Sequence, residues 1–422
     1  MDSMYYGDVL VVDLEAGTTE QVDFVEVDEV GPGLAAGLAL FEKYRDSDPL
    51  VFGSGLFTGT PVPAACLGFV LGKSPLSGEL AVSPLSMFAG AEMKLSGFAM
   101  VVVKGNSSKP VYLWLHDGVP DIEDASGLAG MDTWETTDAI RREMGESMIQ
   151  VISIGPAGEA GSKLASISIN YWGSGDTDAL AAVMGEKKLK AVAVRGLGML
   201  DADEPAEFYQ KAFELFGGVK MAKGFGPVTE ALGGPDLDKW LEPLMHRTRA
   251  CFACPGACST FAKYNEDPSV MESSDVEEPG MLVAGAAAAL WLMEGGWEAE
   301  PACRAMEYMA RDGIDMIRGA RELSGKPVSG TAEVEAAVKG LEGSEEAGWP
   351  LGEESPYGLF GAWVPPIAAA DAWLEANRVG YVLGICATFL LLSGVDMNAL
   401  CELCGPAAGI ETSPDEIAAM FE

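Results

Sequence analysis

Three cysteines are closely spaced in the segment Cys251-Phe-Ala-Cys254-Pro-Gly-Ala-Cys258. A four-iron, four-sulfur (4Fe-4S) cluster takes one thiolate on each iron, so a short loop can supply three ligands while a distant segment supplies the fourth. Pro255 and Gly256 disfavour a regular helix here, which allows the three sulfur atoms to converge. The spacing therefore favours an iron-sulfur cluster.

Two other interpretations of the cysteines remain open. Cys251 and Cys254 could join the second C-x-x-C pair, Cys401 and Cys404, in a four-cysteine zinc site, or all of these thiols could be core residues. The order of the spacings in the first segment is the reverse of the radical-SAM arrangement, which argues against that class of enzyme.

The fourth cluster ligand has three candidates. Cys386 lies in a glycine-containing segment that a bulky group could approach closely, and Cys401 and Cys404 form a compact pair. Cys303 and Cys66 are interpreted as core thiols, because a free cysteine usually packs as a small apolar residue.

Composition excludes several classes of protein. The chain has 422 residues with 64 Asp and Glu against 27 Lys and Arg, and this net charge of -37 would repel nucleic-acid phosphates and anionic membranes. With only two histidines, a histidine-rich metal site is excluded. The longest uncharged runs, 281–293 and 379–395, are shorter than the roughly 20 apolar residues of a membrane-spanning helix. Because no signal-peptide pattern is present, we expect a cytoplasmic protein whose cysteines serve metal or redox chemistry.

The apolar pattern predicts an α+β protein in two parts. Strand-like runs occur at 9–14, 18–22, 99–103, 111–115, 149–154 and 191–194. A helix is predicted at 133–144, ending at Gly145. The polar segment 201–205 marks a domain boundary. We therefore expect a β-rich amino-terminal domain at 1–200 and a mainly helical iron-sulfur region at 201–422.

A series of short strings strengthens this interpretation. They are Gly31-Pro-Gly33-Leu-Ala-Ala, Asp48-Pro-Leu50, Leu56-Phe-Thr-Gly-Thr60, Lys73-Ser-Pro-Leu-Ser-Gly78, Glu92-Met-Lys94-Leu-Ser-Gly97, Ile154-Gly-Pro-Ala-Gly-Glu159 and Ala182-Val-Met-Gly185-Glu-Lys-Lys-Leu-Lys-Ala191, followed later by Asp312-Gly-Ile-Asp315 and Gly384-Ile385-Cys386. Together with the three clustered cysteines, in this order, they resemble the aldehyde ferredoxin oxidoreductase family.

Members of that family hold a tungsten bis-pterin cofactor beside one 4Fe-4S cluster, above an amino-terminal base of two β-sheets. The resemblance implies that Cys251, Cys254, Cys258 and Cys386 bind the cluster and that Asp315 lies near a pterin. A carboxylate can accept hydrogen bonds from pterin ring N–H groups.

The resemblance also nominates a set of further cofactor-binding residues. They are Lys73, Gly155, Gly158, Ala182, Gly185 and Gly384. Lys73 and the backbone N–H groups of the 155–158 turn could meet pterin phosphates in an otherwise acidic protein. Each glycine turn could equally be a strand-to-helix connection.

The chain also departs from the family pattern. Gly173-Ser-Gly-Asp-Thr-Asp178 replaces a glycine stretch that should contain an arginine, Tyr381 stands where an aspartate is expected, and Glu278-Pro-Gly-Met281 replaces Pro-Glu-Tyr-Glu. The helical region is shorter than the family's. We therefore expect a shortened and divergent member.

Two functions follow from this resemblance. The first is an oxidoreductase that oxidises an aldehyde or related oxo substrate at a tungsten or molybdenum bis-pterin and passes electrons to the cluster. Because no histidine follows His246, Glu277 and Glu278 are its candidate catalytic residues. The alternative is a non-catalytic paralogue, an iron-sulfur electron-transfer or scaffold subunit that has lost the tungsten site. The expected partner is an electron-transfer protein or a stably bound redox subunit, and an oligomer is compatible with the sequence.

Overall fold

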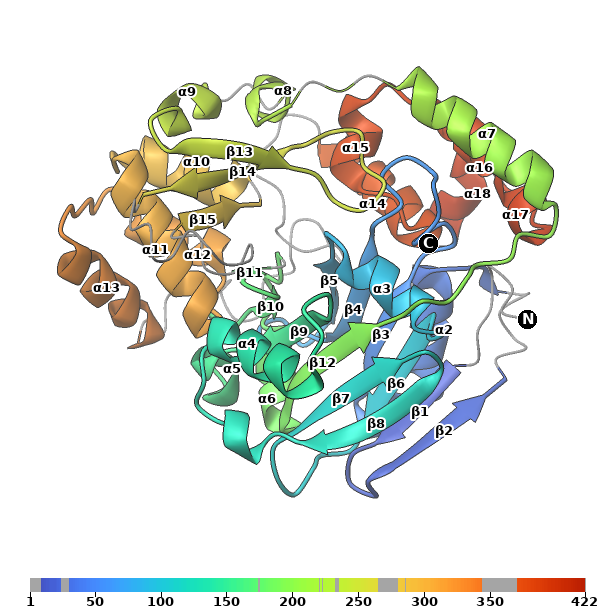
Figure 1. Cartoon of the computed structure of the whole chain (residues 1–422), viewed down its shortest axis with the longest axis horizontal. Helices are drawn as coiled ribbons and strands as arrows, with labels where there is room; N and C mark the ends of the chain where they lie inside the picture. Colours follow the sequence, from blue (N-terminus) through green and yellow to red (C-terminus); the bar gives the residue numbers. More distant parts are fainter. Residues whose placement is uncertain are drawn as a thin grey trace.

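The computed structural model describes residues 9–23, 30–173, 175–219, 221, 223–231, 235–264, 280–284, 286–343 and 370–421. Its amino-terminal part contains two six-stranded mixed sheets, which lie at the bottom of Figure 1. The first has the order β2-β1-β6-β3-β4-β5 and the second the order β11-β10-β9-β12-β7-β8. The β-rich amino-terminal domain predicted from the sequence is confirmed.

Each sheet is built from six strands that are consecutive in the sequence. The first sheet comprises β1 (Val9–Asp13), β2 (Thr18–Val22), β3 (Leu50–Ser54), β4 (Gly68–Lys73), β5 (Leu80–Leu85) and β6 (Met100–Lys104). The second comprises β7 (Val111–His116), β8 (Val119–Asp124), β9 (Gln150–Ile154), β10 (Ile167–Ile169), β11 (Trp172–Gly173) and β12 (Leu189–Arg195). The pairs β1–β6 and β7–β12 are parallel, and the other neighbours are antiparallel.

Strand β1 shows why these segments form sheet. Its side chains alternate between two cores: Leu10 and Val12 pack in the large core shared by both sheets, whereas Val9 and Val11 pack in the core that covers the opposite face. The helices on the two sheets include α2 (Leu34–Lys43), α3 (Ala89–Leu95), α4 (Thr133–Met144), α5 (Pro156–Glu159) and α6 (Leu180–Glu186). Helix α4 ends at Gly145 as predicted, with a φ of 67°.

The rest of the described chain is largely helical, as predicted. Its helices are α7 (Pro205–Gly218), α8 (Gly226–Ala231), α9 (Leu237–Leu241), α10 (Ala286–Glu294), α11 (Ala299–Asp312), α12 (Met316–Leu323), α13 (Thr331–Lys339), α14 (Ala370–Leu383), α15 (Ala387–Leu392), α16 (Met397–Cys401), α17 (Cys404–Ala408) and α18 (Pro414–Ala419). None of the described helices has the length and apolar composition needed to cross a membrane. The domain boundary near 200 falls between β12 and α7 and stays a prediction.

A small sheet interrupts the helical region. It consists of β13 (Met245–Arg249), β14 (Ser259–Lys263) and β15 (Gly280–Val283), all antiparallel. Figure 1 shows the β13–β14 hairpin between two groups of helices, α10 to α13 on one side and α14 to α18 with α7 on the other. The uncharged run 281–293 is therefore not one helix, because its first residues form β15.

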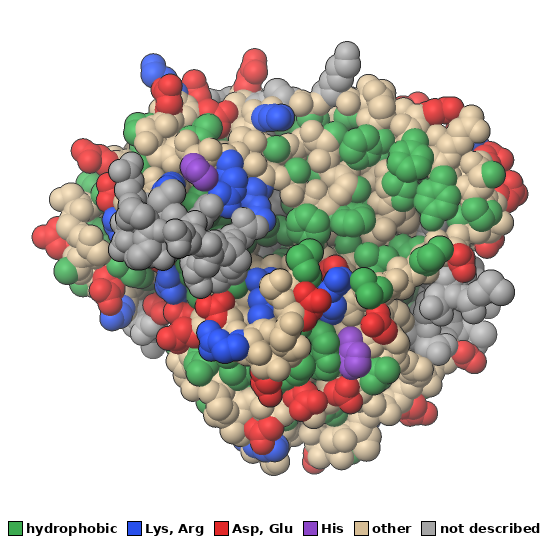
Figure 2. All heavy atoms as spheres, viewed as in Figure 1, with side chains coloured by type: hydrophobic (Ala, Val, Ile, Leu, Met, Phe, Trp, Pro, Cys, Tyr) green, Lys and Arg blue, Asp and Glu red, His purple; other side chains and the backbone are tan. Residues whose placement is uncertain are grey.

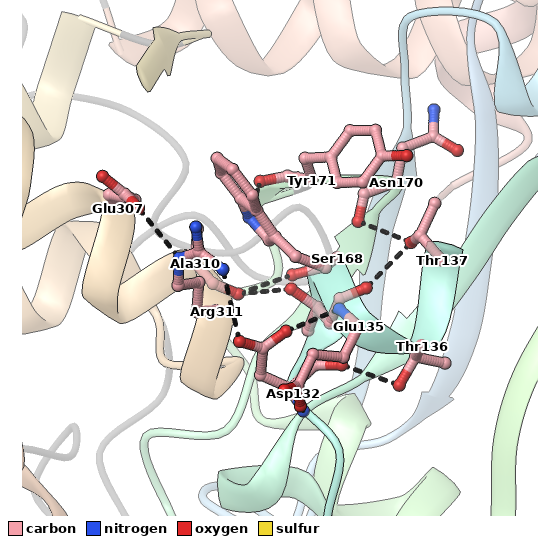
Figure 3. A network of polar contacts seen from close by, with 12 residues as sticks. Asp132, Glu135, Thr136, Thr137, Ser168, Asn170, Tyr171, Glu307, Ala310 and Arg311 are labelled. Atoms are coloured by element: carbon pink, nitrogen blue, oxygen red, sulfur yellow. Dashed lines mark hydrogen bonds and ion pairs between the residues drawn. The ribbon is translucent and has the colours of Figure 1, made fainter. Parts of the chain in front are cut away.

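Polar contacts join α11 to the amino-terminal sheets, as Figure 3 shows. Thr133 Oγ1 donates a 2.8 Å hydrogen bond to the carbonyl oxygen of Ala310, and the Arg311 guanidinium lies 3.4 Å from Asp132 Oδ2. Arg311 also lies 3.8 Å from the centre of the Trp134 ring. These contacts fix the carboxyl end of α11 and therefore the Asp312–Asp315 turn that follows it.

Lys94 anchors the turn after β3. Its side chain is buried, and Nζ donates hydrogen bonds of 3.0 Å and 2.5 Å to the carbonyl oxygens of Gly55 and Leu56. The carboxyl end of α14 packs on the same turn. Leu56 N donates to Val382 O at 3.0 Å, and Phe57 N donates to Leu383 O at 2.7 Å.

Replacing Lys94 with methionine should change how stability depends on pH. Burial lowers the pKa of Lys94 from 10.5 to about 7, so between these values the unfolded chain binds a proton that the folded chain does not. Stability contributed by this group therefore rises with pH, by up to about 1.4 kcal/mol per pH unit. In denaturant titrations, the unfolding free energy of the wild type should rise relative to that of Lys94→Met between about pH 7 and about pH 10. A pH-independent difference would contradict the low pKa.

Gly155 should not tolerate a side chain. A Cβ atom there would lie 2.4 Å from the carbonyl oxygen of Asp312, where the α11–α12 turn packs on the end of β9. We expect Gly155→Ala to cost about 1–3 kcal/mol of unfolding free energy. The control is Gly127→Ala, whose Cβ meets nothing within 4 Å. Equal denaturation midpoints for the two variants would show that this close packing is not required.

Candidate functional site

The three clustered cysteines lie in the loop that joins β13 to β14. This loop reaches the amino-terminal domain through backbone hydrogen bonds: Phe252 N donates to Met87 O at 2.9 Å, and Ala64 N donates to Ala253 O at 2.8 Å. Ala253 has a φ of 48°, in the left-handed region, which turns the chain between the first two cysteines. As expected from Pro255 and Gly256, the loop is not helical.

Cys386 reaches the same place from the end of α14. Gly384 has a φ of 81°, and a Cβ atom on it would lie 2.1 Å from Thr58 Oγ1, so only glycine fits this turn. Leu67 N then donates to Gly384 O at 3.0 Å, and Cys386 N donates to Ala64 O at 3.2 Å. The segment around Ala64 therefore holds both the cysteine loop and Cys386.

Five cysteines lie near this junction, close enough to interact electrostatically. Cys386 interacts electrostatically with Cys66, Cys251, Cys254 and Cys258, and Cys66 donates a hydrogen bond to Cys251. Cys66 is fully buried, whereas the other four are partly buried. The structure thus brings together the four cysteines predicted to bind a cluster and adds a fifth, Cys66, which had been interpreted only as a core thiol.

The thiols shift one another's pKa. Burial and the neighbouring sulfur atoms raise the pKa of Cys254 to about 12 and also raise the pKa of Cys258 and Cys386. The hydrogen bond from Cys66 lowers the pKa of Cys251 and, with burial, raises that of Cys66. Several adjacent thiolates are therefore costly without a neighbouring positive charge, and bound iron ions supply such a charge.

The remaining cysteines do not interact electrostatically with this group. Cys401 and Cys404 are buried in α16 and α17, which pack against α18 and α7, and Cys303 is buried in α11. The zinc interpretation needs the pair in α16 and α17 to meet Cys251 and Cys254, and the structure does not assemble that set. Within the described residues, no three His, Cys, Asp or Glu side chains are arranged to hold a single metal ion. A cluster distributes its ligands over four irons, so its thiolates need not converge on one point.

A second buried group of polar residues forms where α12 begins. The turn before α12 is held by two backbone hydrogen bonds, Ser166 N to Gly313 O and Asp315 N to Leu164 O, each of 2.7 Å. This places Asp315 beside the 176–178 segment, and the Asp315 carboxylate interacts electrostatically with Asp176 and Asp178.

Most of the hydrogen bonds to the Asp315 carboxylate come from residues of α12. Its Oδ1 accepts hydrogen bonds from Ile317 N at 2.8 Å and Arg318 N at 3.1 Å, which caps the helix. Its Oδ2 accepts a 2.5 Å hydrogen bond from Arg318 Nε, and both side chains are 2% exposed. The Arg318 Nη1 and Nη2 atoms have no hydrogen-bond partner among the described residues.

Asp176 and Asp178 differ in their surroundings. Asp176 accepts hydrogen bonds from four backbone N–H groups, including Ile167 N and Ala181 N, so its main role is to hold the start of α6. Burial and the charge of Asp178 nevertheless raise the pKa of Asp176 to about 7. For Asp178, burial raises the pKa to about 6, although the positive charge of Arg318 lowers it in part.

Tyr381 connects the two groups. The residue is buried, and its phenol interacts electrostatically with both Cys386 and Asp178. Burial raises the pKa of Tyr381, so the phenol stays neutral. The five cysteines near Ala64 and the polar residues Asp178, Asp315 and Arg318 are therefore neighbouring parts of one region. We call the polar residues the Arg318 group.

The other predicted residues occupy diverse positions. Lys73 lies exposed at the end of β4, next to the buried Ser74, whose Oγ donates to Asp178 O at 2.9 Å. Gly158 and Gly185 let α5 and α6 cross closely, since a Cβ on Gly185 would lie 2.0 Å from Gly158 O, and Ala182 is buried in α6. Glu277 and Glu278 fall outside the described residues.

Sequence reasoning missed Cys66, Asp178 and Arg318 as parts of the region. Cys66 stands outside any cysteine motif, and Arg318 belongs to an ordinary amphipathic helix. Arg318 could have been linked to Asp315 from the sequence, because side chains three residues apart lie on the same face of a helix.

Comparison with known proteins shows relatives of the amino-terminal part. Residues 9–196 match the family model described as aldehyde ferredoxin oxidoreductase, N-terminal domain. The chain is 28% identical over 320 residues to a tungsten-containing aldehyde ferredoxin oxidoreductase of Pyrococcus abyssi, covering 67% of this chain and 52% of that protein. It is 34% identical over 288 residues to the protein of the same name from Pyrococcus furiosus, covering 59% of this chain and 47% of that one. The chain thus spans about half the length of these relatives.

Solved structures show the same fold. The chain is similar to one in the active site complex BamBC of benzoyl coenzyme A reductase with 1,5-dienoyl-CoA, with a TM-score of 0.76 over 100% of this chain and 87% of that chain. The sequence identity is 18%, so this likeness concerns the fold alone. Residues 9–196 therefore form an amino-terminal domain of the aldehyde ferredoxin oxidoreductase type.

Proposed function

We propose that the chain is an oxidoreductase that holds a 4Fe-4S cluster on Cys251, Cys254, Cys258 and Cys386. The observation that carries the proposal is the docking of two segments, more than a hundred residues apart in sequence, on Ala64. This docking leaves the four thiols close enough to interact electrostatically. The substrate class suggested by the family is an aldehyde or related oxo compound.

The residues present suit both groups that such an enzyme needs. The thiols offer more sulfur ligands than a 4Fe-4S cluster requires. The two orphaned Arg318 amino groups suit a cofactor that carries hydrogen-bond acceptors, as a pterin does. A tungsten or molybdenum bis-pterin would supply two-electron oxidation with oxygen from water, and the cluster would carry electrons singly.

Residues of this chain would then have separate tasks. Amide groups of Thr388 and Phe389 at the start of α15 partly offset the rise in the pKa of Cys386, which helps that thiol to ionise for metal binding. Tyr381, which is buried and interacts electrostatically with both Cys386 and Asp178, would help to exclude water from this region. Glu277 and Glu278 stay candidates for handling the substrate proton.

A second candidate function is a non-catalytic iron-sulfur subunit without the pterin metal. It is favoured by Tyr381, which stands where the family's aspartate is expected, and by the absence of an arginine from residues 173–178. Under this alternative the four cysteines would still bind the cluster, and Asp178, Asp315 and Arg318 would only stabilise the fold.

An electron-transfer partner would have to approach an acidic molecule. The net charge of -37 disfavours capture of another acidic protein by electrostatic attraction. Large apolar side chains are exposed on and just before α7, among them Met199 at 81% and Phe213 at 62%, and Figure 2 shows green side chains gathered there. We propose that a redox subunit uses these exposed apolar side chains.

Single cysteine variants should identify the cluster ligands. Anaerobically prepared wild type should contain about four irons per chain and absorb near 400 nm. We expect Cys386→Ala to lose most of the iron, because the cluster would lose one of its four proposed thiolates. Cys404→Ala is the buried control, and both it and Cys66→Ala should keep the full iron content. Loss of iron in Cys66→Ala but not in Cys386→Ala would make Cys66 the fourth ligand.

Metal analysis separates the two candidate functions. Protein produced with both tungstate and molybdate should contain about one of these metals for every four irons, together with pterin, if it is the proposed enzyme. Iron without tungsten, molybdenum or pterin would reject the enzyme and support the electron-transfer subunit. Zinc in place of iron would reject both.

A further inference from the structure

Cys66 lies on the short loop that receives both sources of the proposed cluster ligands. Its backbone N–H donates to Ala64 O at 2.8 Å, and Ala64 also bonds to the cysteine segment and to Cys386. The next residue, Leu67, donates to Gly384 O at 3.0 Å. Contacts on both sides of Cys66 therefore fix its backbone relative to the two docked segments.

The Cys66 thiol has a specific partner. It donates a hydrogen bond to the sulfur atom of Cys251, and the residue is only 1% exposed, so water does not compete for the donor. A thiol has one proton and therefore makes one such bond. Four thiolates satisfy the four irons of a cluster, so a fifth thiol beside them keeps its proton. Cys66 is thus suited to donate to a cluster ligand rather than to bind iron itself.

A hydrogen bond to a ligand sulfur changes the redox behaviour of a cluster. Reduction adds an electron, and part of the added negative charge lies on the sulfur ligands. A donor aimed at one of these sulfur atoms stabilises the reduced state more than the oxidised state, and burial strengthens the effect. The net charge of -37 acts in the opposite direction, because it disfavours an added electron. A buried donor beside the cluster offsets part of that cost.

We propose that Cys66 raises the reduction potential of the cluster through the hydrogen bond from its thiol to the sulfur atom of Cys251. Cys66 acts through Cys251 and is therefore a positioning residue, not a cluster ligand. A higher potential makes the cluster a better acceptor for the electrons released by substrate oxidation. This inference rests on the proposed function, because it describes how the cluster of that function is tuned.

The test uses the full chain, purified anaerobically, with the reduced cluster followed by electron paramagnetic resonance at a series of fixed solution potentials. Cys66→Ala removes the donor, so the equilibrium constant for cluster reduction should fall about three- to tenfold. A tenfold fall corresponds to a potential about 59 mV lower for a one-electron couple. Cys66→Ser keeps a hydroxyl donor and should retain most of the wild-type potential. The matched control is Cys404→Ala, which removes another buried thiol and should leave the potential unchanged.

Iron content and the unfolding midpoint are measured for every variant. If Cys66→Ala fails to fold, Cys66→Val takes its place, because it fills the same space without a donor and should show the same fall. A variant without the donor that keeps its iron and the wild-type potential overturns the inference. Equal falls in Cys66→Ala and Cys66→Ser also overturn it, because the hydrogen bond would then not set the potential. Loss of iron from both variants would do the same, since Cys66 would then be needed to hold the cluster.

The same measurements separate this inference from the proposed function. A wild type without iron would refute the proposed function and this inference with it. An iron-bearing wild type whose potential does not depend on Cys66 would refute this inference alone.

Discussion

Backbone hydrogen bonds between residues 56–67 and 382–386 hold the candidate site together. They are made by Leu56, Phe57, Leu67 and Cys386 N–H groups, and they lay the end of α14 along the loop that follows β3. Gly55 and Gly384 make this approach possible, because a Cβ atom on Gly55 would lie 2.0 Å from Gly384 N. Without this docking, Cys386 and Tyr381 would have no fixed position relative to the amino-terminal sheets.

The same loop also receives the cysteine segment. Ala64 donates to Ala253 and accepts from Cys386, so one residue of the amino-terminal domain contacts both sources of cluster ligands. A cluster held here would be bound at a junction of three segments rather than within one domain. Metal binding would therefore contribute to the stability of that junction, since ligands from distant segments become linked.

Much of this could be predicted from the sequence, and the exceptions have physical causes. The strands of the β1–β2 hairpin follow from short strand-like runs on either side of a turn, and α4 follows from helical spacing and its terminal glycine, which are local signals. The β13–β15 sheet was not predicted, because Met245–Arg249 is mostly polar and lacks an alternating apolar pattern. Cys386 was nominated through family resemblance, and its place beside Cys251 depends on contacts across the chain. The roles of Cys66 and Arg318 also depend on tertiary packing, which no local pattern encodes.

The most direct test of the central claim is the iron anomalous signal from crystals grown under anaerobic conditions. The account predicts a compact group of iron atoms bonded to the sulfur atoms of Cys251, Cys254, Cys258 and Cys386, with Cys66 within hydrogen-bond distance of a ligand sulfur. Iron bound by Cys401 or Cys404, or no iron at the junction, would contradict it.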